Sequence, residues 1–317
     1  MAEKIEQSLP WLTILAIFVL TIFGAGVVLK EIMADTIIPT VTVGSAAPTI
    51  GTIVLNVGNA ISLTENSNVY IMATATVTDT NGYADIKSVT SSLECNQTTT
   101  ICGLGVGNAP TWCYYIPNGN GSSTCATTSC AGNSCTIVCG TPVWFVAEPT
   151  DASGTYPAKA WEIDITVSDI AANVARGSTT QELNILPAVD VSSSIAYGSL
   201  NPGGTSTEKY TNSTNTGNLK IDLTMLGTST WATGPLIIDT GRQKYATESA
   251  MGDWATGTAL ASNTAALWNY DLIKPTATTT NTATGSIYWM IKIPDGQAAG
   301  SYSGTTTITP VWSATNG

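Results

Sequence analysis

The feature that most constrains this chain is an uncharged apolar run near its start, WLTILAIFVLTIFGAGVVL, from Trp11 to Leu29. An α-helix needs about 20 predominantly apolar residues to cross the hydrocarbon core of a bilayer, and 18 or more without a charge make a stretch a candidate. The run therefore predicts an N-terminal hydrophobic α-helix. The rest of the chain must then belong to a protein that meets a membrane at least transiently.

The residues before this run, 1–10, leave the fate of the predicted helix open. They carry Glu3, Lys4 and Glu6 in place of the basic start of a secretory signal peptide, and the apolar run is longer than a usual signal core. Ala34 offers only a mediocre cleavage site. These features favour a retained anchor or a helix in a filament core over a discarded signal, and all three interpretations stay open.

The composition of the 317 residues is that of an extracellular β protein. Charged residues make up 10%, against about 25% in an average globular protein, and Thr, Ser, Asn and Gly fill the difference. The net charge of −11 argues against a basic groove for nucleic acid. Histidine is absent, which removes Ser-His-Asp and Cys-His nucleophiles and His-ligated metals, and no pair of acids stands out for glycoside hydrolysis. We therefore expect no enzymatic activity.

All seven cysteines lie within one window, residues 95–139. Their spacings contain no C-x-x-C zinc knuckle, and a chain behind an export segment reaches an oxidising compartment, so disulfides are favoured over zinc. Because seven is odd, one cysteine stays a thiol, pairs between chains or is otherwise occupied. The window is rich in Gly, Asn, Ser and Thr, and we expect an insertion outside the sheets. The candidates for disulfides are Cys95, Cys102, Cys113, Cys125, Cys130, Cys135 and Cys139.

Apolar residues alternate with polar ones along much of the chain, which predicts a mainly β fold. In residues 69–78, Ile, Ala, Ala and Val alternate with Tyr, Met and Thr, and residues 161–168 alternate most regularly of all. One face of each strand should be core and the other solvent. Further strands are expected at 49–57, 60–64, 86–93, 142–147, 219–225 and 287–293.

Three segments of the first half carry recognisable motifs: TVTVGSAAPT from Thr40, VTDTNG from Val77 and WEIDITVSDIAANVA from Trp161. They resemble the Ig-like, cadherin- or PKD-like β-sandwich repeats of prokaryotic surface proteins. Those repeats typically open with an APT strand, carry a V-T-D-x-N-G turn and close on a V-x-V-x-D-x-x-x-N strand. The resemblance implies an antiparallel sandwich over residues 40–186 and says almost nothing about function.

A second β unit follows Pro187, with the segments YGSLNPGG, NTGN and PDGQAAGSYSGTTTIT. These segments resemble a second Ig-like sandwich of cell-surface and filament-forming β proteins. The expected organisation is therefore a polar leader, hydrophobic helix and stalk at 1–39, one sandwich with the Cys-rich insertion at 40–186, and another at 187–317. A hydrophobic helix ahead of a β body also resembles pilin and archaeal flagellin subunits in architecture, and Glu6 matches the Glu that pilins place before the helix.

A possible calcium loop follows the strand at 69–78. Asp79, Asn81 and Asp85 offer oxygen ligands beside Gly82, and Asp169 could complete the site if the two loops meet at one pole of the sandwich. The alternative is an Asx/Gly hairpin turn, which needs no ion. The twelve-residue loop with a terminal Glu is absent, and Ca²⁺ is the only cofactor that the sequence suggests.

Two further groups have a functional and a structural interpretation. Asn96, Asn120 and Asn212 begin N-x-S/T sequons, which mark surface sugars in a glycosylating host or arise by chance in a Ser/Thr-rich chain. Aromatic residues of the irregular stretch 228–284 form either a sugar-stacking platform or a buried satellite core, and the core is favoured. These aromatic residues are Trp231, Trp254, Trp268, Tyr245 and Tyr270.

The sequence thus predicts an extracellular structural or adhesive surface protein, anchored or assembled into a pilus-like filament through its N-terminal helix. Self-association through that helix and through sheet edges is the expected partnership, because open sandwiches leave unpaired backbone groups at their edges. The alternative is a secreted glycan-binding module that recognises surface glycans, with calcium as a possible requirement.

Overall fold

A computed structural model describes residues 39–95, 109–119, 121–227, 230–246, 251–278 and 283–313. The chain divides into two compact units, 1–44 and 45–317. The apolar run Trp11–Leu29 lies outside the described residues, so its helix stays a prediction. Where the structure describes the chain, it contains no helix long and apolar enough to cross a bilayer. Its helical segments there are short 3₁₀ turns: η1 (Asn56–Gly58), η2 (Tyr83–Asp85), η3 (Thr240–Arg242) and η4 (Trp254–Thr256).

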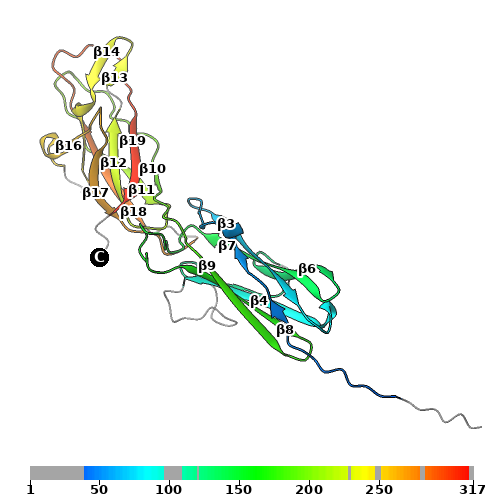
Figure 1. Cartoon of the computed structure of the whole chain (residues 1–317). Coiled ribbons are helices and arrows are strands. Elements are labelled where there is room, and N and C mark those ends of the chain that lie inside the picture. The colour runs from blue at the N-terminus through cyan, green and yellow to red at the C-terminus, as the bar shows by residue number, and fades with distance from the viewer. Residues whose placement is uncertain are drawn as a thin grey trace, which may run out of the picture. The chain divides into compact units, whose positions relative to one another are not determined.

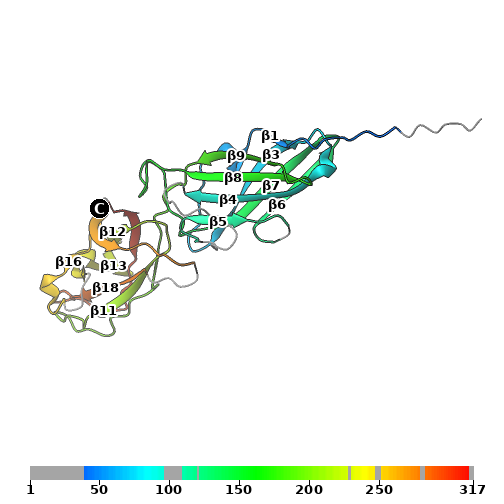
Figure 2. The same cartoon turned by 90° about the horizontal axis from the view of Figure 1, so that it is seen from below.

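The first part of the 45–317 unit is a β-sandwich of two antiparallel sheets (Figure 1 and Figure 2). One sheet has the order β1-β3-β7-β6, with β2 also paired to β3, and the other has the order β5-β4-β8-β9. This confirms the mainly β class. The strands are β1 (Thr49–Ile50), β2 (Val54–Leu55), β3 (Asn68–Thr78), β4 (Ile86–Cys95), β5 (Cys113–Ile116), β6 (Thr124–Ala131), β7 (Ser134–Trp144), β8 (Trp161–Asp169) and β9 (Val174–Gln181).

The alternation of β3 and β8 builds the core of this sandwich, as their sequences predict. The two sets of inward residues, one from each sheet, belong to a single hydrophobic cluster. Burying such a side chain fully is worth about 1.5–3 kcal/mol, so the two strands together supply a large share of the driving force. The inward residues, each exposed by 6% or less, are Ile71, Ala73, Ala75 and Val77 on β3 and Trp161, Ile163, Ile165 and Val167 on β8.

The two strands expected at 49–57 and 60–64 are much shorter in the structure. Only the two-residue strands β1 and β2 form, and Ile61 makes a single bridge to Leu183. β2 ends at Leu55 because Asn56 and Val57, with φ angles of 47° and 56°, turn the backbone out of the extended conformation. A strand cannot continue through left-handed residues, so the pairing ends there.

The described part of the cysteine window belongs to the sheets, which differs from the expected insertion. Cys125 of β6 lies directly opposite Cys139 of β7, and the two form a disulfide. Cys130 and Cys135 form a second disulfide across the turn between the same strands. Cysteine behaves as a small apolar residue in the interior, so Cys135 and Cys139 take two inward positions of β7 that an aliphatic residue would usually hold.

The remaining cysteines have different states. Cys113, at the start of β5, is also disulfide-bonded. Cys95, at the end of β4, keeps a buried thiol outside the disulfides. Cys102 lies outside the described residues. Most of the described cysteines of this window therefore form disulfides, which their spacings favour over zinc binding.

The second sandwich packs a five-stranded sheet, β10-β11-β18-β15-β16, against a three-stranded sheet, β17-β12-β19, with the hairpin β13-β14 beside them. Its core includes the predicted inward residues Leu219, Ile221, Leu223 and Met225, each exposed by 1% or less. The strands are β10 (Val189–Val191), β11 (Lys209–Asn215), β12 (Ile221–Gly227), β13 (Thr230–Thr233), β14 (Leu236–Asp239), β15 (Gln243–Ala246), β16 (Thr258–Ala259), β17 (Ala266–Leu272), β18 (Thr284–Ile291) and β19 (Thr306–Trp312).

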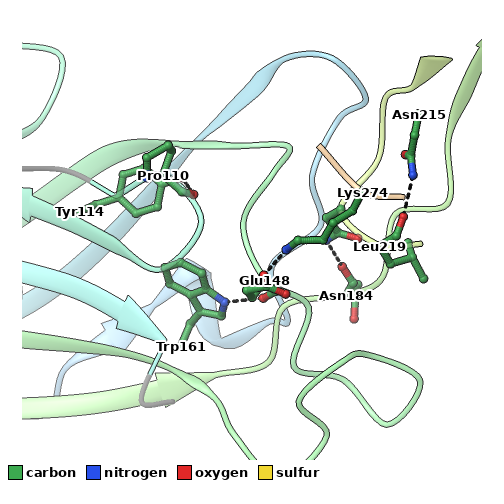
Figure 3. A network of polar contacts seen from close by, with 9 residues as sticks. Pro110, Tyr114, Glu148, Trp161, Asn184, Asn215, Leu219 and Lys274 are labelled. Carbon is green, nitrogen blue, oxygen red and sulfur yellow. Dashed lines mark hydrogen bonds and ion pairs between the residues drawn. The ribbon is translucent and has the colours of Figure 1, made fainter. Parts of the chain in front are cut away.

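Polar contacts connect the two cores (Figure 3). Lys274 forms an ion pair with Glu148, whose backbone carbonyl accepts a 2.8 Å hydrogen bond from the indole of Trp161. Asn218 donates to the backbone carbonyl of Asn184 at 3.1 Å. The last buried residue of the first core in the sequence is Leu183, and the first buried residue of the second core is Leu219. The expected domain boundary at 186/187 stays a prediction.

Candidate metal centre

Three of the four residues proposed as calcium ligands, all of them carboxylates, come together at one end of the first sandwich. Asp79 follows β3, Asp85 ends the turn η2, and Asp169 is the last residue of β8. One oxygen from each lies within 4.8 Å of the others. The register explains the meeting, because β4 begins directly after Asp85 and its Ile86 pairs with Asp169.

The turn that carries two of these carboxylates also has the predicted Asx/Gly geometry. The backbone N–H of Asn81 donates to Asp79 Oδ1 at 2.8 Å, and Gly82 has a φ of 104° that favours glycine. The side-chain oxygen of Asn81 accepts a 2.7 Å bond from the Ala46 N–H. The turn and the carboxylate cluster are therefore features of the same loop and do not exclude one another.

The electrostatics of the cluster favour a cation. Asp79 and Asp169 are exposed by only 1% and 0%, and Asp79 Oδ2 has no hydrogen-bond partner among the described residues. A buried oxygen of this kind is expensive when it is left unpaired. Two like charges 4 Å apart repel by about 4 kcal/mol at an effective dielectric of 20. A bound cation would offset both costs.

Asp169 is held in its ionised form by hydrogen bonds. Burial alone would raise its pKa, but bonds from the side chain and backbone of Asn173, from Ser45 and from the backbone of Ala171 outweigh burial and lower the pKa. The Asn173 bonds are 2.7 Å each, one to each carboxylate oxygen. The carboxylate is therefore charged at neutral pH and suited to bind a metal ion.

The first residues of the 45–317 unit are fastened to the same cluster. Ser45 Oγ lies 3.0 Å from Asp169 Oδ2 and 3.5 Å from Asp85 Oδ2, and it accepts a 3.2 Å bond from Asn173. Sequence reasoning did not single out Ser45 or Asn173. Asn173 was nevertheless visible as the last residue of the D-x-x-x-N motif that begins at Asp169.

The donor set indicates which ion fits. The groups that meet here are carboxylates and a hydroxyl, which are hard oxygen ligands, whereas zinc and copper sites use imidazole or thiolate. Ca²⁺ takes several oxygens in irregular arrangements and accepts carboxylates in either denticity. The residues present therefore fit Ca²⁺, with Asp79, Asp85 and Asp169 as the charged ligands and Ser45 as a neutral one.

The other candidate residues have separate places. Asn212 is exposed on β11, whereas Asn96 and Asn120 lie outside the described residues. Tyr245 is in the second core, and Trp268 and Tyr270 pack against that core, which agrees with the core interpretation of the aromatic group. The indole of Trp254 donates to the Arg242 carbonyl at 2.8 Å. Trp231 differs because it lines a hollow in the surface.

No family model and no curated protein matches this chain. Among solved structures it is similar to the CsuC–CsuE chaperone–tip adhesion subunit complex of Acinetobacter baumannii Csu pili, with a TM-score of 0.34 and 10% identity over 80% of this chain and 96% of that one. A chaperone–tip adhesin complex of CFA/I fimbriae is similar with a TM-score of 0.26 and 9% identity. That match covers 81% of this chain and 79% of the other. Dimeric latent PorU of Porphyromonas gingivalis is similar with a TM-score of 0.25 and 15% identity. That match covers 82% of this chain and 20% of the other. TM-scores this low support no argument about function, so the function is inferred from the residues of this chain alone.

Proposed function

We propose that this chain is an extracellular structural or adhesive surface protein, which its N-terminal apolar segment anchors or assembles into a pilus-like filament. Its first sandwich binds Ca²⁺ at Asp79, Asp85 and Asp169. The observation that carries the proposal is that Ser45 bonds to Asp169 of this cluster and Ala46 bonds to Asn81 of the adjoining turn. The cation site thus lies where the first sandwich begins.

The chemistry of the site gives calcium a structural role. An ion among the three carboxylates would neutralise their repulsion and join the loops at 79–85 and 169–173 to the first residues of the sandwich. The ion would thereby add to the hydrogen bonds that already hold Ser45 and Ala46 at the cluster. Sites of extracellular modules bind calcium with dissociation constants of about 10⁻⁴ to 10⁻³ M, which suits a permanent structural ion outside the cell.

Other features support a location outside the cell. Disulfides such as Cys125–Cys139 persist in oxidising compartments and are rare in the cytosol. The net charge of −11 suits a surface that is exposed to solvent. The uncharged run Trp11–Leu29 supplies an anchor or a packing helix.

Antibody labelling of intact cells, together with cell fractionation, tests the surface assignment. Cells that produce the full chain should bind an antibody against residues 45–317 on intact surfaces, and immunogold electron microscopy should show patches or filaments. Deletion of residues 11–29 should abolish surface labelling. Full chain that remains in the cytosol, or that is released as a non-assembling monomer with or without the deletion, would contradict the assignment. The second result would instead favour the secreted glycan-binding module.

Limited proteolysis tests the calcium part separately. Chelation with EGTA should increase cleavage close to Ser45 in surface-displayed protein, and Asp79→Asn should make this cleavage insensitive to calcium. Asp190→Asn, at an exposed position of β10, serves as the control and should behave as the wild type. Equal cleavage with and without EGTA would remove calcium from the proposal and leave the surface assignment in place.

A further inference from the structure

The second sandwich has two adjoining hollows that the proposed cation site does not involve. Their volumes are about 660 and 490 Å³, and they share Ile195 and Trp231. The larger one lies among the segment after β10, the hairpin β13-β14 and the loop 297–302. A volume of this size is in the range of small-molecule sites.

The lining of these hollows is aromatic and uncharged. None of the residues that line either hollow carries a charge, although the chain has a net charge of −11. Three half-buried aromatic side chains line the larger hollow, namely Tyr197, Trp231 and Tyr302. The rings of Tyr197 and Trp231 are 5.9 Å apart and tilted by 50°. Ile238 and Ile291 add a buried apolar wall.

Polar groups are placed among these rings. Gln297 donates to Tyr302 Oη at 2.6 Å, and that hydroxyl donates to the Ala298 carbonyl at 2.8 Å. The hydroxyl of Tyr197 accepts a 2.9 Å bond from Gln243. The two tyrosines are therefore held in place by hydrogen bonds, while the carboxamide oxygen of Gln297 retains acceptor capacity beside the hollow.

The indole N–H of Trp231 is a donor that the described part of the protein does not use. The indoles of Trp161, Trp254 and Trp289 each donate to a protein acceptor at 2.8–2.9 Å. Trp231 makes no such bond within the described residues, although it lines both hollows. Because this N–H lies at the hollow, it can donate to a ligand that supplies an acceptor.

We infer that this hollow is a binding site for a neutral oligosaccharide. Pyranose rings present apolar C–H faces that pack on aromatic rings, and their hydroxyls exchange hydrogen bonds with amides, phenols and indoles. An acidic or basic sugar would lose its hydration in a lining that offers no opposite charge, so the uncharged lining selects neutral sugars. The inference rests on the adhesive part of the proposed function and names the class of ligand.

The test is a glycan array probed with the full chain in a mild detergent, with neutral, sialylated and sulfated oligosaccharides side by side. Neutral glycans should bind, and isothermal titration with the strongest of them should show at least tenfold weaker binding for Trp231→Ala. Tyr210→Ala is the matched control, because Tyr210 is 66% exposed on β11 outside both hollows, and its affinity should stay within twofold of wild type.

Two further measurements keep the outcome interpretable. Gly304 packs close to the Trp231 ring, so Trp231→Ala could disturb its surroundings. Trp231→Phe keeps an aromatic ring but removes the indole N–H together with the five-membered ring, and it should weaken binding less than Trp231→Ala while unfolding at the wild-type temperature. Binding that prefers charged glycans, that is equal in Trp231→Ala and wild type, or that is absent would overturn the inference. Surface labelling of the same cells shows whether the surface assignment stands independently of that result.

Discussion

Lys274, which follows β17 of the second sandwich, forms an ion pair with Glu148, which follows β7 of the first. The two side chains are only 20% and 4% exposed, and Glu148 Oε2 has no hydrogen-bond partner among the described residues. Burial raises the pKa of Glu148, although the positive charge of Lys274 acts to lower it. Burial likewise lowers the pKa of Lys274, although the negative charge of Glu148 acts to raise it. The attraction within the pair therefore only partly offsets its desolvation, and the pair mainly fixes the geometry of the contact.

Substitutions at this pair should be strongly non-additive. Lys274→Met leaves a buried carboxylate without its partner and should lower the free energy of unfolding by about 3 kcal/mol, and Glu148→Met should have a similar effect. The double variant removes both charges and should lie within about 1 kcal/mol of wild type. Urea denaturation of all four proteins gives the cycle, and a double variant that loses the sum of the single effects would refute this account.

A second ion pair provides the control for that cycle. Lys220 and Asp271 are 2.5 Å apart, but their side chains are 26% and 50% exposed. Solvent screens such a pair, so Lys220→Met should change the free energy of unfolding by less than about 1 kcal/mol. A loss as large as that of Lys274→Met would mean that burial is not what separates the two pairs.

The two disulfides of the β6-β7 hairpin should differ in their contribution to stability. Cys125–Cys139 joins residues 14 apart in sequence, and Cys130–Cys135 joins residues 5 apart. The entropy lost by the unfolded chain gives about 3 kcal/mol for the longer loop and about 2 kcal/mol for the shorter one. Thermal denaturation of the two double-alanine variants should therefore show the larger loss for Cys125 and Cys139, and the reverse order would contradict it.

Gly217 should tolerate no side chain. A methyl group there would overlap the carbonyl oxygen of Leu186 and lie 2.9 Å from the backbone nitrogen of Ala188. Backbone atoms cannot move aside without disturbing the hydrogen bonds around them, so Gly217→Ala should lower the free energy of unfolding by more than about 2 kcal/mol. Gly121→Ala, where the added methyl stays 3.6 Å from Ser123, is the control and should change stability by less than about 0.5 kcal/mol.

The sequence predicts the fold class and the core better than it predicts the strand ends. Period-2 alternation identifies β3 and β8 almost to the residue, because a strand with one buried face must alternate. It fails around Asn56 and Val57, where two residues other than glycine adopt positive φ angles that no pattern of apolar residues reveals. It also misses most of β7, where Cys135 and Cys139 occupy two of the inward positions and interrupt the pattern of apolar residues.

The candidate metal centre is predictable in its ligands and not in its surroundings. Asp79, Asp85 and Asp169 stand out because each follows or closes a predicted strand or turn. Ser45 does not, because only the folded chain brings it across to residues far away in sequence. The ion pair of Glu148 and Lys274 is invisible to sequence reasoning for the same reason, since 126 positions separate the two residues.

The pH dependence of stability should identify Asp169 as a charged, hydrogen-bonded group. Its pKa is lowered in the folded protein, so its stabilising effect is complete above the ordinary Asp value of about 3.9 and disappears as the pH falls through the lowered value. In EGTA, Asp169→Asn should therefore be less stable than wild type by a constant amount from pH 8 to about 5. The difference should shrink below about pH 4, and a gap that widens on acidification would be inconsistent with this assignment.

Calcium titration of the full chain in a mild detergent, followed by calorimetry and by the unfolding temperature, is the decisive test of the proposed calcium site. Wild type should bind one Ca²⁺ with a dissociation constant of about 10⁻⁴ to 10⁻³ M, and its unfolding temperature should rise with calcium. Asp79→Asn should lose both effects, while Asp190→Asn keeps them. No binding heat and no shift in wild type, or the same response in Asp79→Asn, would contradict the proposed role of Asp79, Asp85 and Asp169.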